Sequence, residues 1–265
     1  MHHSRAQIIA TIGPLTRSID YLRVLIDRGV DVIRLDFSQE TFEEHRRTIH
    51  NLRIAASDHH RYIPIIGDLV GPRIEQDSRS HYSHSSLSPI TEHDREAIAF
   101  GIEQEIDYVA LAYVGSSDDV QDLQNILWEK NSRARIIAKI ERIEALRNIN
   151  NIVDTADAIM IARDNLGNDV PIEQIPYIQH NIISIANWAH KPVITTEMLH
   201  SMISSPTPTR ADISDIASAI ISGSDALVLD RETADGKYPI EAVEMMDRAI
   251  LEAERHVAHR DAHTL

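Results

Sequence analysis

The sequence predicts an α/β fold, a closed (β/α)8 barrel. Eight short apolar segments alternate with longer stretches of helical period, which is the pattern of βαβ units around a parallel sheet. The segments are apolar on both faces, as strands are between a barrel interior and a shell of helices. Eight βα units in about 250 residues is also the usual size of such a barrel. An open doubly wound sheet is the alternative that the same alternation allows.

The expected strands follow one another regularly along the chain. They lie at residues 7–11, 31–35, 63–67, 108–112, 135–138, 158–161, 192–195 and 226–229. Helix starts are marked between them. Thr91 with Asp94, and Thr209 with Asp212, have the spacing of capping boxes, and Pro239 suits the first turn of the last helix.

Composition excludes several classes of protein. The 265 residues, 43% hydrophobic and 25% charged, suffice for a buried core, and we expect one domain over 1–265. Cysteine is absent, which excludes disulfides and thiolate sites and leads us to expect a cytoplasmic protein. A net charge of −15 opposes binding to nucleic acid, and no apolar run has the roughly 20 residues that a membrane span needs. We therefore expect a small partner, with no nucleic acid and no membrane.

One connection is longer than the others. Residues 73–90, after the third expected strand, are polar, rich in Ser and His, and without period. Loops of this length are uncommon unless they have a role. Because the segment follows the carboxyl end of a strand, where barrel enzymes place their chemistry, it is expected to be a lid or else a surface loop.

Charged and polar residues collect at the carboxyl ends of the expected strands, which face one opening in such a barrel. In chain order they are Arg34, Asp36, Asp68, Lys139, Glu141, Arg163, Asp164, Asn165, Thr195, Thr196, Glu197, Asp230, Arg231 and Glu232. Charges at strand ends often only solvate a rim. Several cations and carboxylates around one opening instead point to a site for a small anion.

Lys139 and Glu141 are the most specific pair. At positions i and i+2 of one strand their side chains point to the same side. One interpretation is an internal salt bridge that neutralises a crowded core. The other is a lysine beside an anionic substrate, with Glu141 as an oxygen ligand of a magnesium-like ion that keeps several waters. These two residues alone leave both interpretations open.

Seven blocks of residues resemble pyruvate kinases, in the same order and at the same spacing. They are ATIGP at 10–14, IRLDFS at 33–38, GP at 71–72, AKIE at 138–141, MIARDNLG at 160–167, PTPTRA at 206–211 and ETADGKYP at 232–239. The resemblance covers nearly the whole chain. It implies a (β/α)8 barrel of the phosphoenolpyruvate/pyruvate-binding type, which agrees with the count of strands.

The resemblance also shows what the chain lacks. The family normally inserts a β-rich lid domain after the third strand, where this chain has only residues 73–90. The family normally continues after the eighth helix into a C-terminal regulatory domain. We therefore expect a catalytic barrel alone.

The resemblance assigns roles to residues at the strand ends. Lys139 matches the lysine that neutralises the transferring phosphoryl group, Arg34 the arginine that contacts phosphate, and Thr196 the threonine that helps protonate the enolate carbon. These three are the expected catalytic residues. The expected substrate-binding residues are Arg34, Lys139, Arg163, Asp164 and Thr196.

The divalent metal, Mg²⁺ or Mn²⁺, is also implied by the resemblance. Glu141 matches one of its carboxylate ligands, and the second, an aspartate in the family, aligns with Asn165. Loss of that negative charge should weaken metal binding unless the neighbouring Asp164 substitutes. The expected metal ligands are therefore Glu141, Asn165 and Asp164.

The monovalent-cation site of the family is altered. The matching positions are Asp36, Ser38, Asp68 and Leu69. Family members that do without potassium carry a basic residue at the place of Arg73. We expect the Arg73 guanidinium to supply the positive charge, balanced by Asp36 or Asp68, so that potassium is not required.

The nucleotide side departs furthest from the family. Val70, Glu75 and Gln39 stand where the family has a lysine, an arginine and a histidine, and Gly115 replaces another arginine. Tyr113 replaces a phenylalanine. Because phosphoryl transfer relies on positioning and on cations around the phosphates, the enolate side should be the better preserved.

Three functions remain open. The first is phosphoryl transfer between phosphoenolpyruvate and ADP with magnesium. The second is enolate chemistry on a 2-oxo acid without a nucleotide, such as aldol cleavage or hydrolysis. The third is a non-catalytic barrel that binds a small anion or a partner protein. The expected ligand is phosphoenolpyruvate, pyruvate or another 2-oxo acid, and the resemblance implies a homodimer or tetramer through the sixth and seventh helices.

Overall fold

The computed structural model describes residues 4–76, 79–82 and 88–262, with side chains described outside 73–87 and 260–265. Within the described residues, eight strands close into a barrel in the order β1, β10, β9, β8, β7, β6, β3, β2. The strand pairs run parallel. The predicted (β/α)8 fold is confirmed, and the alternative of an open sheet is wrong.

The chain divides into two compact units, which are described separately. The first unit holds the described residues up to Arg34, Arg47–Ile63, and those from Ile194 onward. The second unit holds Leu35–Arg46 and Pro64–Val193. Strands β2 (Val32–Asp36) and β9 (Val193–Thr195) and helix α2 (Phe42–Asp58) contribute residues to both units.

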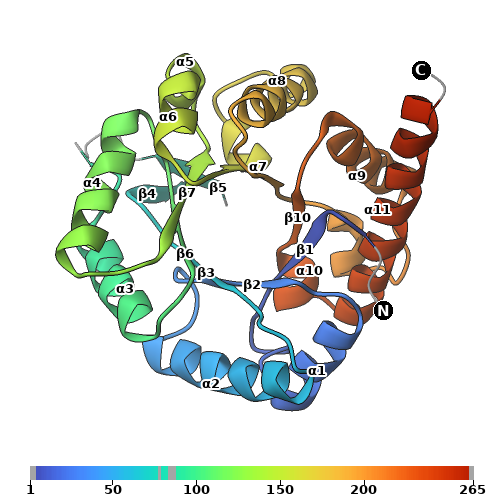
Figure 1. The fold of residues 1–265 in the computed structure, drawn as a ribbon, viewed down its shortest axis with the longest axis horizontal. Helices are drawn as coiled ribbons and strands as arrows, with labels where there is room; N and C mark the ends of the chain where they lie inside the picture. The colour runs from blue at the N-terminus through green and yellow to red at the C-terminus, as the bar shows by residue number, and fades with distance from the viewer. Residues whose placement is uncertain (1–3, 77–78, 83–87, 263–265) are drawn as a thin grey trace. The chain divides into compact units, whose positions relative to one another are not determined.

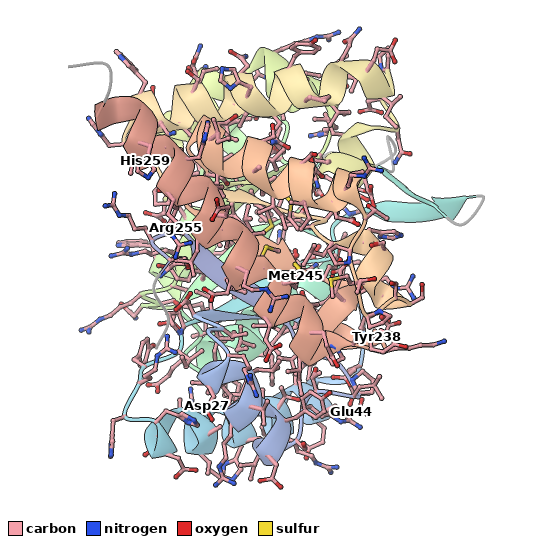
Figure 2. The ribbon with its side chains drawn as sticks, turned by 90° about the vertical axis from the view of Figure 1, so that its right-hand side faces the viewer. Asp27, Glu44, Tyr238, Met245, Arg255 and His259 are labelled. Atoms are coloured by element: carbon pink, nitrogen blue, oxygen red, sulfur yellow. The ribbon has the colours of Figure 1, made fainter. Side chains whose placement is uncertain are left out.

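The first unit is built around strand β1, which pairs with β10 and with the start of β2. The elements that lie wholly within it are β1 (Gln7–Thr11), α1 (Ile19–Asp27), η2 (His200–Ile203), α9 (Arg210–Ser222), β10 (Ala226–Leu229), α10 (Arg231–Ala234) and α11 (Pro239–Ala262). Helix α11 packs beside α9 (Figure 1). Figure 2 looks onto α11, where Arg255 and His259 are exposed, while Val243, Met246 and Ile250 are buried against the unit.

The second unit is built around four consecutive parallel strands, β3, β6, β7 and β8. Its elements are β3 (Ile65–Asp68), β4 (Arg73–Gln76), β5 (Arg79–Tyr82), α3 (Glu92–Glu103), β6 (Tyr108–Leu111), α4 (Ser117–Glu129), β7 (Arg135–Ile140), α5 (Ile143–Arg147), α6 (Ile149–Thr155), β8 (Ala158–Ile161), α7 (Arg163–Leu166), η1 (Ile172–Gln174) and α8 (Ile175–Trp188). The residues of β3, β6, β7 and β8 are almost all buried, as expected of a barrel wall.

The predicted elements match the structure closely. Strands β1, β8 and β10 have the predicted bounds, and the others differ by one or two residues at an end. Thr91 with Asp94, and Thr209 with Asp212, form the predicted capping boxes. Helix α11 begins at Pro239, as predicted. Strand β7 ends at Ile140, so Glu141 lies just after the strand rather than within it.

The long polar connection contains regular structure that the sequence prediction missed. Strands β4 and β5 pair antiparallel, with Arg73 opposite Tyr82. Their polar residues carry little of the apolar alternation from which strands are predicted, and this explains the miss. The rest of the segment, at 77–78 and 83–87, lies outside the described residues. Its role as a lid or a surface loop stays a prediction.

Aspartates just before three strands hold the start of the neighbouring strand. In the first unit, Asp31 Oδ2 accepts the backbone N–H of Ile8 at 3.1 Å. In the second, Asp107 Oδ2 accepts that of Ile65, and Asp157 Oδ2 that of Ile136, each at 2.8 Å. A carboxylate that accepts a backbone N–H makes a strong hydrogen bond. These bonds fix the register of the strands at their amino ends. The candidate site residues lie at the carboxyl ends.

No helix among the described residues is both long and apolar enough to cross a membrane.

Candidate functional site

Each unit carries a cluster of polar and charged side chains at the carboxyl ends of its strands. The cluster of the second unit surrounds Lys139, and that of the first unit surrounds Arg34. Each is described by itself.

In the second unit, Lys139 lies between two carboxylates. Its Nζ is 3.0 Å from Asp68 Oδ1, at the end of β3, and 3.3 Å from Glu141 Oε1, just after β7. The Lys139 side chain is 12% exposed and the two carboxylates are almost fully buried. Burying charges is costly unless they are paired. The three side chains together carry a formal charge of −1, so a further cation is favoured there.

Glu141 also accepts hydrogen bonds from two neutral donors. The backbone N–H of Tyr113 donates to Oε2 at 2.6 Å, and the Asn165 side-chain amide donates to Oε1 at 2.7 Å. Tyr113 has φ of 52°, in the left-handed region that bulky residues rarely adopt. Such a conformation costs of the order of 1–3 kcal/mol and persists where its surroundings hold it. The strained Tyr113 thus helps to fix the position of the Glu141 carboxylate.

The sequence predicted that Lys139 and Glu141 would share a side, and the structure brings them together with Asp68 and Asn165. The structure shows the ion pair of the salt-bridge interpretation, between Lys139 and Glu141. It does not remove the functional interpretation, because a buried ion pair is weak evidence of a stabilising role. The Tyr113 N–H was not predicted, since a backbone group leaves no residue-type signal in the sequence.

The expected metal ligands lie partly within this cluster. Asn165 contacts Glu141, but it does so with its NH₂ group, because an amide oxygen would be repelled by the carboxylate. Asp164 is exposed on the four-residue helix α7. Among the described residues, no group of three or more His, Asp or Glu side chains is arranged to hold a metal ion. Mg²⁺ usually takes only one or two carboxylates and keeps several waters, so Glu141 suits such an ion, and the Asn165 amide would have to turn its oxygen toward it to become a second ligand.

Arg163 makes a different contact from the one expected. It lies at the start of α7, and its Nη1 donates to Gln179 Oε1 on α8 at 3.4 Å. This contact directs the guanidinium toward α8. Its expected role in substrate binding stays a prediction.

A second guanidinium, not predicted from the sequence, lies beside Gly115. A Cβ added at Gly115 would lie only 2.1 Å from Arg142 Nη2, so the Arg142 side chain occupies the space that a side chain at 115 would need. The same Nη2 is 3.7 Å from Asp119 Oδ2. The resemblance implied the loss of an arginine at 115, and the structure shows that a cation from the adjacent strand end lies there instead. Arg142 directly follows Glu141 in the sequence, but no motif there indicates a contact with position 115.

The positions that match the monovalent-cation site lie together in the second unit. Asp36 Oδ1 accepts the backbone N–H of Ser38 at 2.9 Å, and the Asp68 carbonyl accepts the N–H of Phe37 at 3.1 Å. Leu69 is buried. The side chain of Arg73 lies outside the described side chains, so its pairing with Asp36 or Asp68 stays a prediction. The Asp68 carboxylate does have a cationic partner, which is Lys139.

In the first unit, Arg34 is held at the end of the barrel wall by two neighbours. Its Nη1 donates to Thr11 Oγ1, on β1, at 3.0 Å and to Asp230 Oδ1, just after β10, at 2.6 Å. The Arg34 side chain is 10% exposed and that of Asp230 is 40% exposed. The residue expected to contact phosphate is therefore already paired with a carboxylate of its own chain.

Thr196 is buried just after strand β9. The neighbouring Thr195 shares a 2.8 Å hydrogen bond with Ser224. Glu197 and Leu199 follow with φ of 64° and 59°, both in the left-handed region. The chain after β9 is thus bent sharply by residues that rarely adopt this conformation.

Glu232 is a buried carboxyl in the first unit, whereas the sequence predicts only a charged residue at a strand end. It is 1% exposed, and its Oε2 accepts the backbone N–H of Asp230 at 2.7 Å. Burial raises the pKa of Glu232 to about 7, against the lowering effect of the backbone hydrogen bonds. Glu232 is therefore a group that gains or loses a proton near neutral pH.

We predict that Glu232 makes stability fall as pH rises from about 4.5 to about 7. Over this range the folded protein keeps a proton that the unfolded chain releases, so the folded state is disfavoured by up to about 3 kcal/mol above pH 7. Replacement by Glu232→Gln should flatten this dependence, as measured by urea unfolding at several pH values. Glu129→Gln, at an exposed carboxylate of α4, is the control. Equal pH slopes in wild type and Glu232→Gln would contradict the prediction.

A family model described as "Pyruvate kinase, barrel domain" matches residues 3–88 and 79–243. The match is divided at the polar segment where the resemblance implied a missing insertion. Pyruvate kinases of Agrobacterium vitis and Geobacillus stearothermophilus are each 33% identical, over 98% and 97% of this chain. The pyruvate kinase of Dictyostelium discoideum is 32% identical over 98%.

The matches also show a difference in length. This chain covers 70% of the first of these relatives, 58% of the second and 68% of the third. The alignments to the first two extend over 341 positions, more than the 265 residues of this chain, so the relatives carry residues within the aligned region that this chain lacks. With its barrel fold and matched blocks, the chain belongs to the pyruvate kinase family.

Proposed function

We propose that this barrel binds phosphoenolpyruvate and pyruvate and transfers the phosphoryl group between phosphoenolpyruvate and ADP. The observation that carries the proposal is the buried ammonium of Lys139, held by Asp68 and Glu141 within the AKIE block that the family shares. A buried lysine fixed by two carboxylates at a strand end suits the stabilisation of charge that develops on a reacting anion.

The roles of the other residues follow from the family and are part of the proposal. Arg34 contacts the phosphate, and Thr196 helps to deliver a proton to the enolate carbon. Arg163 and Asp164 complete the substrate-binding residues. Thr196 is buried, which suits a proton transfer shielded from water.

A divalent cation, Mg²⁺ or Mn²⁺, is part of the same proposal. Glu141 and the amide oxygen of Asn165 would hold it, with Asp164 as a further oxygen donor. When bound, such an ion polarises a phosphoryl or enolate oxygen as a Lewis acid. The formal charge of −1 on Asp68, Lys139 and Glu141 supports its binding.

Nucleotide-independent enolate chemistry on a 2-oxo acid is a second candidate. It is favoured by the loss of several cationic residues on the nucleotide side, at Val70, Glu75 and Gln39. The Arg142 guanidinium beside Gly115 instead favours phosphoryl transfer, because it keeps one cation on the nucleotide side. A barrel that only binds an anion is the remaining alternative.

Other features of the proposal concern the whole protein. We propose one barrel domain over 1–265, a cytoplasmic location, and a homodimer or tetramer, as in the family. Activity should not need potassium if Arg73 supplies the positive charge of the monovalent-cation site.

The proposal predicts ADP-dependent formation of pyruvate from phosphoenolpyruvate with Mg²⁺, measured by a coupled assay on the full chain. Lys139→Met should lower kcat at least 100-fold, since it removes the cation that stabilises the reacting anion. Lys130→Met, at an exposed lysine after α4, should leave the rate unchanged.

The other outcomes are also informative. Pyruvate formation that does not need ADP would favour the nucleotide-independent chemistry. If the protein forms no pyruvate from phosphoenolpyruvate with or without ADP but still binds pyruvate, the result would favour a non-catalytic barrel.

Asn165→Asp should tighten Mn²⁺ binding at least tenfold, because it adds a negative charge beside Glu141. The same change places two carboxylates together, so the metal-free variant should melt at a lower temperature than wild type and regain stability with Mn²⁺. Calorimetric titration and thermal melts provide the two readouts.

The control for this substitution is Asn151→Asp, which adds the same charge at an exposed position of α6. If Asn165→Asp binds Mn²⁺ no more tightly than wild type and this control, Glu141 and Asn165 do not hold the metal.

A further inference from the structure

The contact between Arg34 and Asp230 in the first unit carries an inference beyond the roles carried over from the family. Asp230 Oδ1 lies 2.6 Å from Arg34 Nη1, a short charge-assisted hydrogen bond. The Arg34 side chain is largely buried, so few directions remain from which a ligand can approach it. A ligand anion that takes this donor must compete with Asp230.

The position of Asp230 is fixed by its backbone. Its N–H donates to the buried carboxylate of Glu232 at 2.7 Å, and its carbonyl accepts the N–H groups of Thr233 and Ala234 at 3.2 and 3.0 Å. The backbone of Asp230 has φ of −98° and ψ of −100°, outside the helical and extended regions. The backbone of Asp230 is therefore held in place, and its partly exposed carboxylate makes a short contact with the largely buried Arg34.

The charge of Asp230 changes what Arg34 can recognise. Alone, the guanidinium is suited to a phosphate oxygen. Paired with Asp230, it belongs to a neutral ion pair, and an approaching phosphate meets a carboxylate at close range as well as the cation. A neutral hydroxyl or carbonyl of a ligand meets no such repulsion.

We propose that Asp230 is a specificity-determining residue, whose carboxylate competes with phosphate for Arg34 and shifts the preference of the site from phosphorylated ligands toward 2-oxo acids that carry an uncharged group there. The proposal rests on the proposed function in one respect, since it takes Arg34 as the phosphate contact. Within that function, Asp230 is the residue that weakens phosphate binding at Arg34.

The alternative is that Asp230 only positions Arg34. The two roles predict opposite results when the charge of Asp230 is removed and its shape is kept. If Asp230 competes with the ligand, Asp230→Asn should tighten phosphate binding. If it only holds Arg34 in place, the same change should weaken phosphate binding or leave it unchanged.

The test is a calorimetric titration of the full chain with inorganic phosphate, with all variants measured at the same ionic strength. Asp230→Asn should bind phosphate at least tenfold more tightly than wild type. The matched control is Asp235→Asn, which removes one negative charge just after α10, from a residue that pairs with the exposed Arg231 at 3.1 Å. This control should bind phosphate as wild type does. Thermal melts show whether each variant is folded.

A double variant tests whether the gain in phosphate affinity arises at Arg34. If the gain in phosphate affinity arises at Arg34, it should disappear in Asp230→Asn combined with Arg34→Gln. The proposal is overturned if Asp230→Asn binds phosphate no more tightly than wild type, if Asp235→Asn shows the same gain, or if the gain survives in the double variant.

The titration is independent of turnover. If pyruvate formation from phosphoenolpyruvate fails while Asp230→Asn gains phosphate affinity through Arg34, the proposed kinase function is wrong and the role of Asp230 stands. Substrate preference gives a second readout in folded variants. The ratio of pyruvate affinity to phosphoenolpyruvate affinity should be at least tenfold lower in Asp230→Asn than in wild type, and an unchanged ratio would count against the proposal.

Discussion

The placement of the Lys139 ammonium between Asp68 and Glu141 is the interaction on which the chemistry of the second unit depends. Each of these charges alone would be costly to bury, and replacing such a group by apolar residues of similar volume often stabilises a protein. This favours the proposed chemical role of the three charges over a stabilising one. Glu141 is oriented further by the strained Tyr113 backbone and by Asn165. These contacts hold the Glu141 carboxylate beside Lys139 Nζ, where the proposed function needs it.

The strands supply the rigidity that this arrangement needs. Aspartates at the starts of strands hold their neighbours in register, while the chain at the opposite ends turns through left-handed residues such as Tyr113 and Glu197. Strain of this kind is common at functional sites and requires a scaffold that holds it. In the first unit, the buried Glu232 holds the backbone of Asp230, and the Asp230 carboxylate contacts Arg34.

Much of the fold was predictable from local patterns, since alternating apolar segments and capping boxes mark strands and helix starts. The Lys139–Glu141 pair was predictable because side chains at i and i+2 of a strand share a side. Three kinds of feature were not predictable from the sequence. The hairpin β4–β5 is polar, the Tyr113 N–H is a backbone group, and the contacts of Arg142 with Gly115 and of Asp230 with Arg34 join residues far apart in the sequence. Such contacts depend on packing, which a single sequence does not encode in any short motif.

The ammonium of Lys139 is central to the proposed function, because we infer that it stabilises the negative charge of an enolate-like ligand. Calorimetric titration with oxalate, a stable mimic of the pyruvate enolate, tests this role most directly, with Mg²⁺ present throughout. We expect wild type and Lys130→Met to bind oxalate equally, and Lys139→Met to bind at least tenfold more weakly while remaining folded. Equal affinity of wild type and Lys139→Met would show that the buried ammonium has a structural role only, and would contradict its part in stabilising the ligand.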